Sequence, residues 1–317
     1  MISYIVTKSE AGGRMDKFIK SRLHSAPDSF IYKMARKKNL TLNGKKCEGR
    51  EILKEGDEIK LYVKDETIAL FSGNAQNTDV SEYRKAFETL KGIQVLKETP
   101  DILFLNKPSG ILTQKAEGNT LSLNEWMIGY LLDQSIITEE SLQNFHPSVL
   151  NRLDRNTSGI VLCGITPLGS RVVSKMLKDR TLHKYYECLV KGECKLDGRI
   201  SGYLIKDHAK NQSDFFESLN AVEEKRRKEA KQVSLSVIVL SKENNNTRLS
   251  IELETGKSHQ IRVMMAHFGY PLVGDAKYGS DRVANGQNLH AARVLFPDKC
   301  PEIPYLEGLE VISKPEF

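Results

Sequence analysis

The sequence lacks any apolar run of the ~18 residues that a membrane-spanning helix needs, although 39% of its 317 residues are hydrophobic. Its first ten residues, MISYIVTKSE, contain no basic segment followed by a long apolar stretch, so they do not resemble a secretion signal. The five cysteines are odd in number and include no C-x-x-C pair, and neither they nor the seven histidines have the spacing of a zinc site. We therefore expect a soluble cytoplasmic protein with buried thiols, no metal, no cofactor and no membrane contact.

Charge is unevenly distributed along the chain. At about 150 residues per domain, the length indicates one large or two ordinary domains. Residues 12–50 contain eleven Lys and Arg against three Asp and Glu, a net charge of +8, whereas the whole chain carries +6. The remaining residues therefore carry −2, which indicates a basic N-terminal unit.

This basic unit has a recognisable local pattern. Apolar residues recur at helical spacing over residues 15–23 and again over residues 30–38. Asn43-Gly44 predicts a two-residue hairpin turn, and EGDEIKLYV then alternates as a strand. A cationic face of this kind is either a solvated surface or a site for nucleic acid, and we favour nucleic acid because neutralised phosphates release counterions. The basic residues assigned to that face are Arg14, Lys33, Arg36, Lys37, Lys38 and Lys45.

Residues 12–63 also resemble the small RNA-binding module named after the fourth protein of the small ribosomal subunit. Between Lys64 and Lys91 the hydrophobic periodicity is lost and then returns as a short helix. We therefore predict an RNA-binding module over residues 1–66, a linker over 67–90 and a catalytic domain over 91–317.

Two arginines surround one aspartate in the stretch VLNRLDRNTSGIVL, residues 149–162. SVLNRLD is predicted as a strand, RNTS as a loop and GIVLCGI as another strand, after which Thr166-Pro167 begins a helix that ends near Asp179. Asp154 thus lies where a strand becomes a loop. From these residues alone, an aspartate that caps a turn and pairs with a surface arginine is favoured.

A second stretch, RLSIELETGKSHQIRVMMAHFGYPLVGDAKYG, begins with an alternating strand and turns at Thr255-Gly256. Ser258 is expected to cap a helix that stops at Gly269. His259 and Arg262 are three apart, so they share one side of that helix, where they would serve an anion or simply face solvent.

Four motifs occur in order along the chain: NKPSG, RLDRNTSG, KYYECLVKG and TGKSHQIRV. Together, over residues 102–297, they resemble the pseudouridine synthase family of the RluA type, which includes the large-subunit ribosomal RNA synthases. The resemblance implies an α+β fold, with a mixed, largely antiparallel central sheet flanked by helices. It also implies isomerisation of uridine in RNA: the glycosidic bond is cut, uracil turns, and carbon 5 is joined to the ribose.

The resemblance assigns the catalytic roles to Asp154, Tyr186 and Arg262. A carboxylate beside a breaking glycosidic bond parallels glycoside hydrolysis. In a pocket dry enough to retain uracil, a neighbouring arginine would keep the aspartate charged. Attack on ribose, attack on uracil and removal of a ribose proton stay open, and we favour a route in which Tyr186 assists at carbon 2 of the ribose.

Further residues around these motifs are expected to contact RNA. Arg152 matches an arginine that fills the gap left by a flipped-out nucleotide. Lys257 stands where the family pattern has arginine and loses its two-pronged geometry. The set assigned to RNA contact at this site is Arg152, Arg155, Lys107, Lys257 and His259.

The sequence leaves alternatives open for the target and the activity. The RNA target is expected to be large-subunit ribosomal RNA, with transfer RNA as the second choice, and the protein is expected to be a monomer. A non-catalytic RNA-binding protein would lack Asp154 or Arg262, and a nucleoside hydrolase would need a second carboxylate to activate water. The charged segment 215–232 is expected to form an exposed hairpin or mobile loop.

Overall fold

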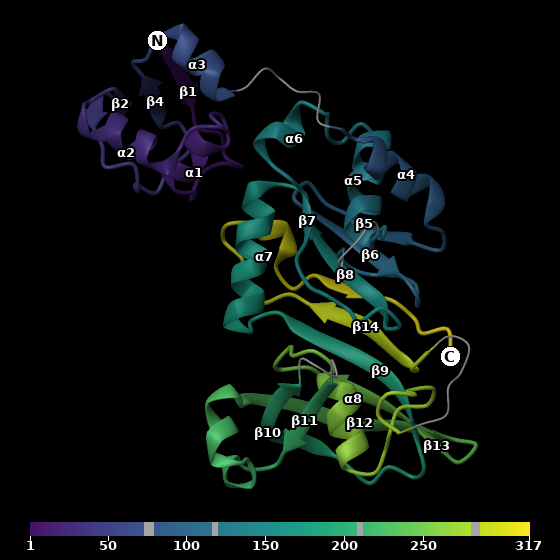
Figure 1. The fold of residues 1–317 in the computed structure, drawn as a ribbon. Coiled ribbons are helices and arrows are strands. Elements are labelled where there is room, and N and C mark those ends of the chain that lie inside the picture. The colour runs from purple at the N-terminus through teal and green to yellow at the C-terminus, as the bar shows by residue number, and fades with distance from the viewer. Residues whose placement is uncertain (73–78, 116–119, 208–211, 280–285) are drawn as a thin grey trace.

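The computed structural model of the chain describes residues 1–72, 79–115, 120–207, 212–279 and 286–317. Its strands form two sheets, a four-stranded sheet near the N-terminus and an eleven-stranded sheet that takes up most of the rest. Figure 1 shows the small N-terminal unit, in purple, beside the end of the larger one. Within the described ranges, no helix has the length and apolar character to cross a membrane.

The N-terminal unit follows the predicted pattern of two helices and a hairpin. Its sheet has the order β1-β4-β2-β3 and is antiparallel throughout. Asn43 and Gly44 both have positive φ, 52° and 72°, as the two-residue turn between β2 and β3 requires. The elements are β1 (Ile2–Ile5), α1 (Met15–Lys20), α2 (Asp28–Arg36), β2 (Leu40–Leu42), β3 (Lys45–Lys46) and β4 (Glu58–Leu61).

The interval predicted as a linker contains helical residues at both ends. α3 (Asp65–Ser72) follows the small sheet, α4 (Ser81–Thr89) precedes the large one, and residues 73–78 lie outside the described residues. α4 packs closely on α5 (Leu123–Asp133): a Cβ added to Gly129 would lie 2.2 Å from the carbonyl oxygen of Tyr83. Residues 81–89 are therefore held against the larger unit.

The large sheet is mixed and largely antiparallel, as expected, with one parallel pair between β14 and β8. Its strands, in spatial order, are β11 (Gln212–Phe216), β10 (Gly198–Asp207), β12 (Lys231–Glu243), β13 (Asn246–Glu252), β9 (His183–Lys191), β14 (Leu289–Leu295), β8 (Ser158–Gly164), β6 (Ile102–Lys107) and β5 (Gln94–Glu98), with β15 (Glu310–Ile312) beside β14 and β7 (Ser148–Val149) beside β8.

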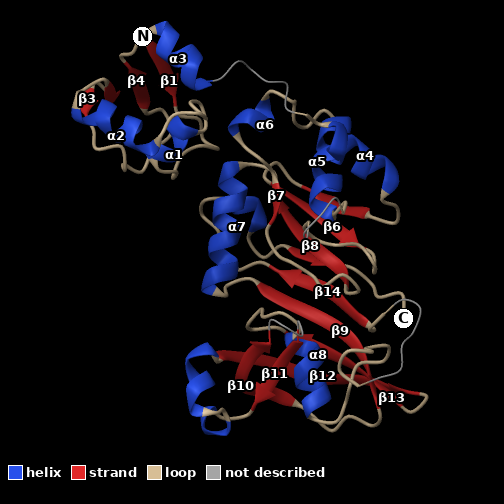
Figure 2. Cartoon of the chain, in the orientation of Figure 1, coloured by secondary structure: helices blue, strands red, loops and turns tan. Residues whose placement is uncertain are grey.

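Helices cover both faces of the β6–β8 half of this sheet. Alternate residues of β6 point to opposite sides, so Phe104 packs with α7 (Pro167–Asp179) while Leu105 packs with α5. As predicted, Thr166 caps α7 and Pro167 is its first residue. Figure 2 shows α7 along one side of this half and α4 and α5 on the other. The short α6 (Ser141–Asn144) leads into β7.

The other half of the sheet contains β10 to β13 with α8 (Gln260–His267) packed nearby (Figure 1). Of the two alternatives for segment 215–232, an exposed hairpin or a mobile loop, the hairpin is wrong, because β11 and β12 both pair with β10 rather than with each other; most of the segment is exposed, as expected. Two short 3-10 helices, η1 (Leu219–Ala221) and η2 (Glu224–Glu229), connect them, and Val222 between them is buried. A third, η3 (Pro304–Leu306), lies near the C-terminus.

One predicted strand is much shorter than expected. Of SVLNRLD, only Ser148 and Val149 pair as β7, so Asp154 lies in a loop well beyond the strand. The backbone of this loop instead bonds to the segment after β6: Gly110 N–H donates to the carbonyl of Arg155, at 2.9 Å. Within the predicted strand, Leu150 N still donates to Leu162 O of β8, but both backbone groups of Leu153 bond to the side chain of Thr113, so the ladder does not continue to Asp154.

Candidate active site

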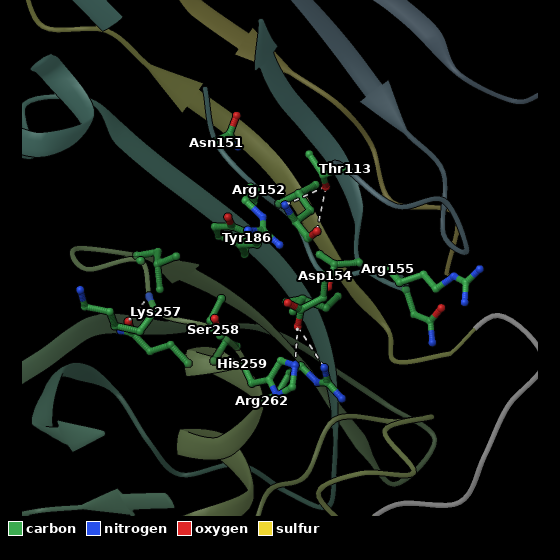
Figure 3. Close-up of a pocket in the computed structure, with 18 of the residues that line it drawn as sticks. Thr113, Asn151, Arg152, Asp154, Arg155, Tyr186, Lys257, Ser258, His259 and Arg262 are labelled. Carbon is green, nitrogen blue, oxygen red and sulfur yellow. Dashed lines mark hydrogen bonds and ion pairs between the residues drawn. The ribbon is translucent and has the colours of Figure 1, made fainter. Parts of the chain in front are cut away.

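Asp154 lies in the loop before β8, and Arg262 lies in helix α8. They are 108 residues apart in sequence and form an ion pair (Figure 3). Arg262 Nη1 donates to Asp154 Oδ2 at 3.0 Å. The other carboxylate oxygen, Oδ1, accepts no hydrogen bond from the described residues. The Asp154 side chain is 28% exposed, so its unoccupied edge remains reachable from solvent.

A second carboxylate, that of Asp275, binds the two nitrogens of Arg262 that do not contact Asp154. Asp275, which is 1% exposed, accepts from Arg262 Nε at 2.7 Å and from Nη2 at 2.9 Å. Burial works to lower the pKa of Arg262, but Asp275, with a smaller effect from Asp154, outweighs burial and raises it. The guanidinium is therefore a permanent cation whose orientation is fixed by a two-point contact.

His259 is the second group that faces the Asp154 carboxylate. Its Nε2 lies 3.8 Å from Asp154 Oδ2, and its Nδ1 lies 2.9 Å from the hydroxyl of Tyr278. That hydroxyl accepts the backbone N–H of Ser213 at 2.9 Å, which favours donation of its own hydrogen to Nδ1 and leaves the imidazole hydrogen on Nε2, toward Asp154. Burial lowers the pKa of His259, although Asp154 opposes the decrease, so the ring is neutral at pH 7.

The prediction that Ser258 caps α8 is wrong. His259 occupies the cap position with φ 59° and ψ 15°, and its side chain makes no capping hydrogen bond. The turn before the helix is held instead by Gln260, whose Oε1 accepts from Thr255 Oγ1 at 2.9 Å and from Lys257 N at 3.2 Å. The left-handed backbone conformation of His259 turns its ring toward Asp154.

Tyr186 lies on β9, the strand that joins the two halves of the sheet. It pairs with Ile251 of β13 on one side and Ala291 of β14 on the other. The side chain is 7% exposed and its ring lines the pocket. Burial, with a further contribution from the charge of Asp154, raises the pKa of Tyr186, so the hydroxyl stays protonated at neutral pH and is a donor rather than a base.

A pocket of about 730 Å³ surrounds these groups. Asp154 is the one carboxylate among its described lining residues. The cationic lining residues are Arg152, Arg155, Lys184, Lys206, Lys257, Arg262 and Lys277. A pocket with this balance attracts a polyanion.

The residues expected to contact RNA near Asp154 have different positions. Arg152, Arg155 and Lys257 are exposed at the pocket, and Arg155 Nε also donates to the carbonyl of Gly110 at 3.1 Å. His259 lies deeper, against Asp154. The pocket thus brings together four of the five residues assigned to this surface.

Lys107 is the exception, and the structure does not support its contact with RNA. The side chain is fully buried, and its ammonium donates to three carbonyl oxygens, those of Pro108, Ile111 and Arg155, at 2.9, 2.9 and 3.0 Å. Burial lowers the pKa of Lys107 to about 7, and Asp154 opposes the decrease. Its three N–H groups are already used inside the protein, so it binds the loop and not a phosphate.

The basic residues assigned to the N-terminal unit are all exposed, but none lines this pocket. Arg14 pairs with Asp16 at 2.6 Å. Among the described residues, no ion pair involves Lys33, Arg36, Lys37, Lys38 or Lys45, so their charges remain available.

Sequence reasoning missed Asp275 and Tyr278, which hold Arg262 and His259, and also Lys184. Lys184 had a readable signal, because it lies two residues before Tyr186 on a strand and therefore shares its face. Asp275 and Tyr278 had none beyond their presence in VGDAKYG. Within the described parts of the chain, no three His, Cys, Asp or Glu residues gather as metal ligands do.

A carboxylate bound by arginine beside a buried tyrosine, in an otherwise cationic pocket, has the composition of an active site for a polyanionic substrate. A family model described as RNA pseudouridylate synthase matches residues 101–267. The chain belongs to this family and is an RNA pseudouridine synthase, an isomerase.

Relatives carry the same description. An uncharacterized RNA pseudouridine synthase of Mycoplasma capricolum is 23% identical over 100% of this chain and 99% of its own length. The ribosomal large subunit pseudouridine synthase C of Escherichia coli is 26% identical over 92% of this chain and 87% of its own. The solved structure of human RNA pseudouridylate synthase domain containing 4 shares the fold, with a TM-score of 0.54 and 16% identity over 74% of this chain and 93% of that one.

Proposed function

We propose that the protein isomerises uridine to pseudouridine in large-subunit ribosomal RNA, with Asp154 as the catalytic group. The observation that carries this is the position of Asp154: a single carboxylate, with one oxygen bound by Arg262 and the other open to a pocket of cations. An anionic oxygen placed in this way suits the electron-poor anomeric carbon that forms as uracil departs.

Arg262 orients the Asp154 carboxylate and gives it a permanent counter-charge, with Nη1 3.0 Å from Oδ2. Tyr186 supplies a flat ring next to the reacting groups, on which a uracil can stack. Its raised pKa makes the hydroxyl a hydrogen-bond donor during rotation of the base.

The uridine must leave its stack to reach Asp154, at a cost of a few kcal/mol that is smallest in loops and single strands. Arg152 is exposed at the mouth of the pocket, where it can occupy the space that the base vacates. The remaining cations, Arg155 and Lys257 among them, would bind flanking phosphates. We therefore propose a weakly paired uridine as the target.

The choice of large-subunit ribosomal RNA is supported by relatives named ribosomal large subunit pseudouridine synthase C, from Escherichia coli and Buchnera aphidicola. The N-terminal unit adds a second RNA contact, since five of its exposed basic residues have no ion pair among the described residues. We propose that residues 1–66 bind RNA beside the target, and that residues 91–317 perform the reaction.

The test is tritium release from RNA labelled at carbon 5 of uridine, because joining that carbon to ribose expels its hydrogen. Wild type, Asp154→Asn and the matched surface variant Asp298→Asn would be incubated with total RNA from cells lacking the enzyme. Release by wild type and Asp298→Asn, but not by Asp154→Asn, is expected. Ribosomal and transfer RNA fractions, mapped by reverse transcription, would then identify the target.

Two other results would change the assignment. Free uracil in the supernatant would indicate a hydrolase, which the pocket disfavours because its described lining offers no second carboxylate. RNA binding without release from any protein would indicate a non-catalytic binding protein.

A further inference from the structure

Thr113 contacts the residue immediately before the catalytic aspartate at two points (Figure 3). Its hydroxyl donates to the carbonyl oxygen of Leu153 at 2.8 Å and accepts from the Leu153 N–H at 3.1 Å. Thr113 is 3% exposed and Leu153 is 7% exposed, so both bonds are shielded from water. One hydroxyl therefore satisfies both backbone groups of a single buried residue.

No other described residue pairs with these two backbone groups. Leu153 lies outside every strand, since β7 ends at Val149 and β8 begins at Ser158. In a β-ladder, a neighbouring strand binds the N–H and C=O groups of a residue. At Leu153 the side chain of Thr113 binds these groups instead. The direction of the chain as it enters Asp154 consequently depends on Thr113.

Thr113 is itself anchored by the start of α5. Its carbonyl accepts from Asn124 N at 3.2 Å and from Ser122 Oγ at 3.4 Å. Ser122 and Glu125 form a capping box, which fixes the first turn of the helix. Asn124 Oδ1 also accepts from Val149 N at 3.1 Å, so the same helix end holds β7.

Different contacts hold the residues that follow Asp154. The carbonyl of Arg155 accepts from Lys107 Nζ and Gly110 N, and the carbonyl of Asn156 accepts from Ser109 Oγ at 3.1 Å. These contacts do not involve the hydroxyl of Thr113. Its removal would leave these downstream contacts in place, and Leu150 N would still donate to Leu162 O at 2.7 Å, but both backbone groups of Leu153 would lose their partner.

We propose that Thr113 is a positioning residue of the active site, whose hydroxyl fixes the backbone of Leu153 and thereby the direction in which the Asp154 carboxylate projects. Thr113 acts through the backbone and not on the substrate. The inference rests on the proposed catalytic role of Asp154. It links a helix N-terminus on one face of the sheet to the reacting oxygen.

The test compares Thr113→Val, which keeps the shape but removes the hydroxyl, with Thr113→Ser, which keeps the hydroxyl. The matched control is Thr41→Val in the small sheet, because Thr41 is also buried but its hydroxyl has no partner among the described residues. Tritium release gives kcat and KM, urea unfolding gives the folded fraction, and hydrogen exchange reports protection of the Leu153 amide.

Thr113→Val is expected to lower kcat by on the order of 100-fold, as displacement of a reacting group by about 1 Å can do, with little change in KM for RNA. The Leu153 amide should lose protection in this variant. Thr113→Ser and Thr41→Val should retain both the activity and the protection of wild type.

The inference is overturned if Thr113→Val keeps the wild-type kcat, or if its loss of activity matches its unfolded fraction and Thr113→Ser is equally impaired. Failure of the proposed function has a different signature, since wild type itself would then release no tritium. That result would also remove the catalytic meaning of the Thr113 contact, even if the Leu153 amide were protected.

Discussion

Arg262 and Asp275 form a buried, two-point ion pair, with Nε to Oδ2 at 2.7 Å and Nη2 to Oδ1 at 2.9 Å. Asp275 also accepts the backbone N–H of Lys277 at 3.1 Å, so it fixes its own turn as well as the arginine. The nitrogen that remains, Nη1, is the one that meets Asp154. The geometry of the Asp154–Arg262 pair is thus set by Asp275, which binds the other two nitrogens of the guanidinium.

Asp275→Asn should therefore affect both stability and activity. Removing the charge of the buried partner leaves Arg262 with the partly exposed Asp154 as its remaining counter-charge among the described residues, and we expect the free energy of unfolding to fall by about 3 kcal/mol. Tritium release should fall as well, because Arg262 can then turn from Asp154. Urea unfolding and the release assay measure the two effects.

The control for this variant is Glu310→Gln, which breaks the exposed pair of Arg293 and Glu310 (2.8 Å, with side chains 38% and 40% exposed). An exposed pair contributes less than about 1 kcal/mol. Equal losses in Asp275→Asn and Glu310→Gln would contradict the structural role given to Asp275.

The exposed cations of the N-terminal unit should control RNA affinity without controlling chemistry. Replacing them with Gln is expected to weaken binding and to reduce the slope of log affinity against log salt by up to about 3, at ~0.7 per lost single-strand phosphate contact. Activity at saturating RNA should persist. The four residues changed together are Lys33, Arg36, Lys37 and Lys38.

A variant with the same change in net charge elsewhere separates local contacts from general electrostatics. Its four lysines are exposed in the larger unit and away from the pocket: Lys195, Lys242, Lys299 and Lys314. If both variants lose the same affinity and slope, the N-terminal unit is not a specific RNA contact.

Acid should destabilise the protein through His290. This ring is 2% exposed and lies between Ser158 Oγ at 2.8 Å and Ser313 Oγ at 3.0 Å. Burial lowers its pKa from 6.5 to about 4. The unfolded chain binds the proton first, so this contribution is intact above pH 6.5 and is lost as pH falls through 4.

The loss amounts to about 3 kcal/mol, at ~1.4 kcal/mol for each pKa unit. Urea unfolding at pH 7 and pH 4 measures it, with His290→Asn as the comparison. The variant should lose correspondingly less stability between the two pH values. Parallel pH dependence in wild type and His290→Asn would show that another group is responsible.

Gly159→Ala should disrupt the junction of β8 and β14. Gly159 has φ +110°, and an added Cβ would lie 2.4 Å from the carbonyl oxygen of Ala291. We expect a loss of at least ~2 kcal/mol in unfolding free energy from overpacking and backbone strain. Thermal unfolding of both variants measures the effect. Gly256→Ala is the control and should leave stability unchanged, because its Cβ would lie 3.6 Å from Lys184 Nζ, an ordinary contact distance.

The elements that sequence reasoning predicted well have local signals. Thr166 and Pro167 begin α7, and Asn43-Gly44 makes the first hairpin, because capping and turn chemistry act within a few residues. The short β7 and the position of His259 were not predicted, because side chains rather than a backbone pattern bond these segments: Thr113, 40 residues from Leu153, at one and Gln260 at the other.

The site was predictable only through the family resemblance. Spacing alone gives no reason to join Asp154 to Arg262, 108 residues away, and the residues by themselves favoured a capped surface turn. Lys107 shows the opposite failure. Its charge suggested RNA, whereas the carbonyls of Pro108, Ile111 and Arg155, which the fold brings together around it, determine where its ammonium lies.

A carboxylate group is planar and symmetric, and in water its two oxygens exchange roles freely. In this protein the symmetry of Asp154 is broken, because Oδ2 is held by Arg262 while Oδ1 accepts no hydrogen bond from the described residues. The two oxygens of the carboxylate are consequently not equivalent. A molecule that approaches Oδ1 meets an available lone pair, whereas one that approaches Oδ2 meets a guanidinium, so two oxygens that are chemically identical in free aspartate become distinguishable in the folded protein.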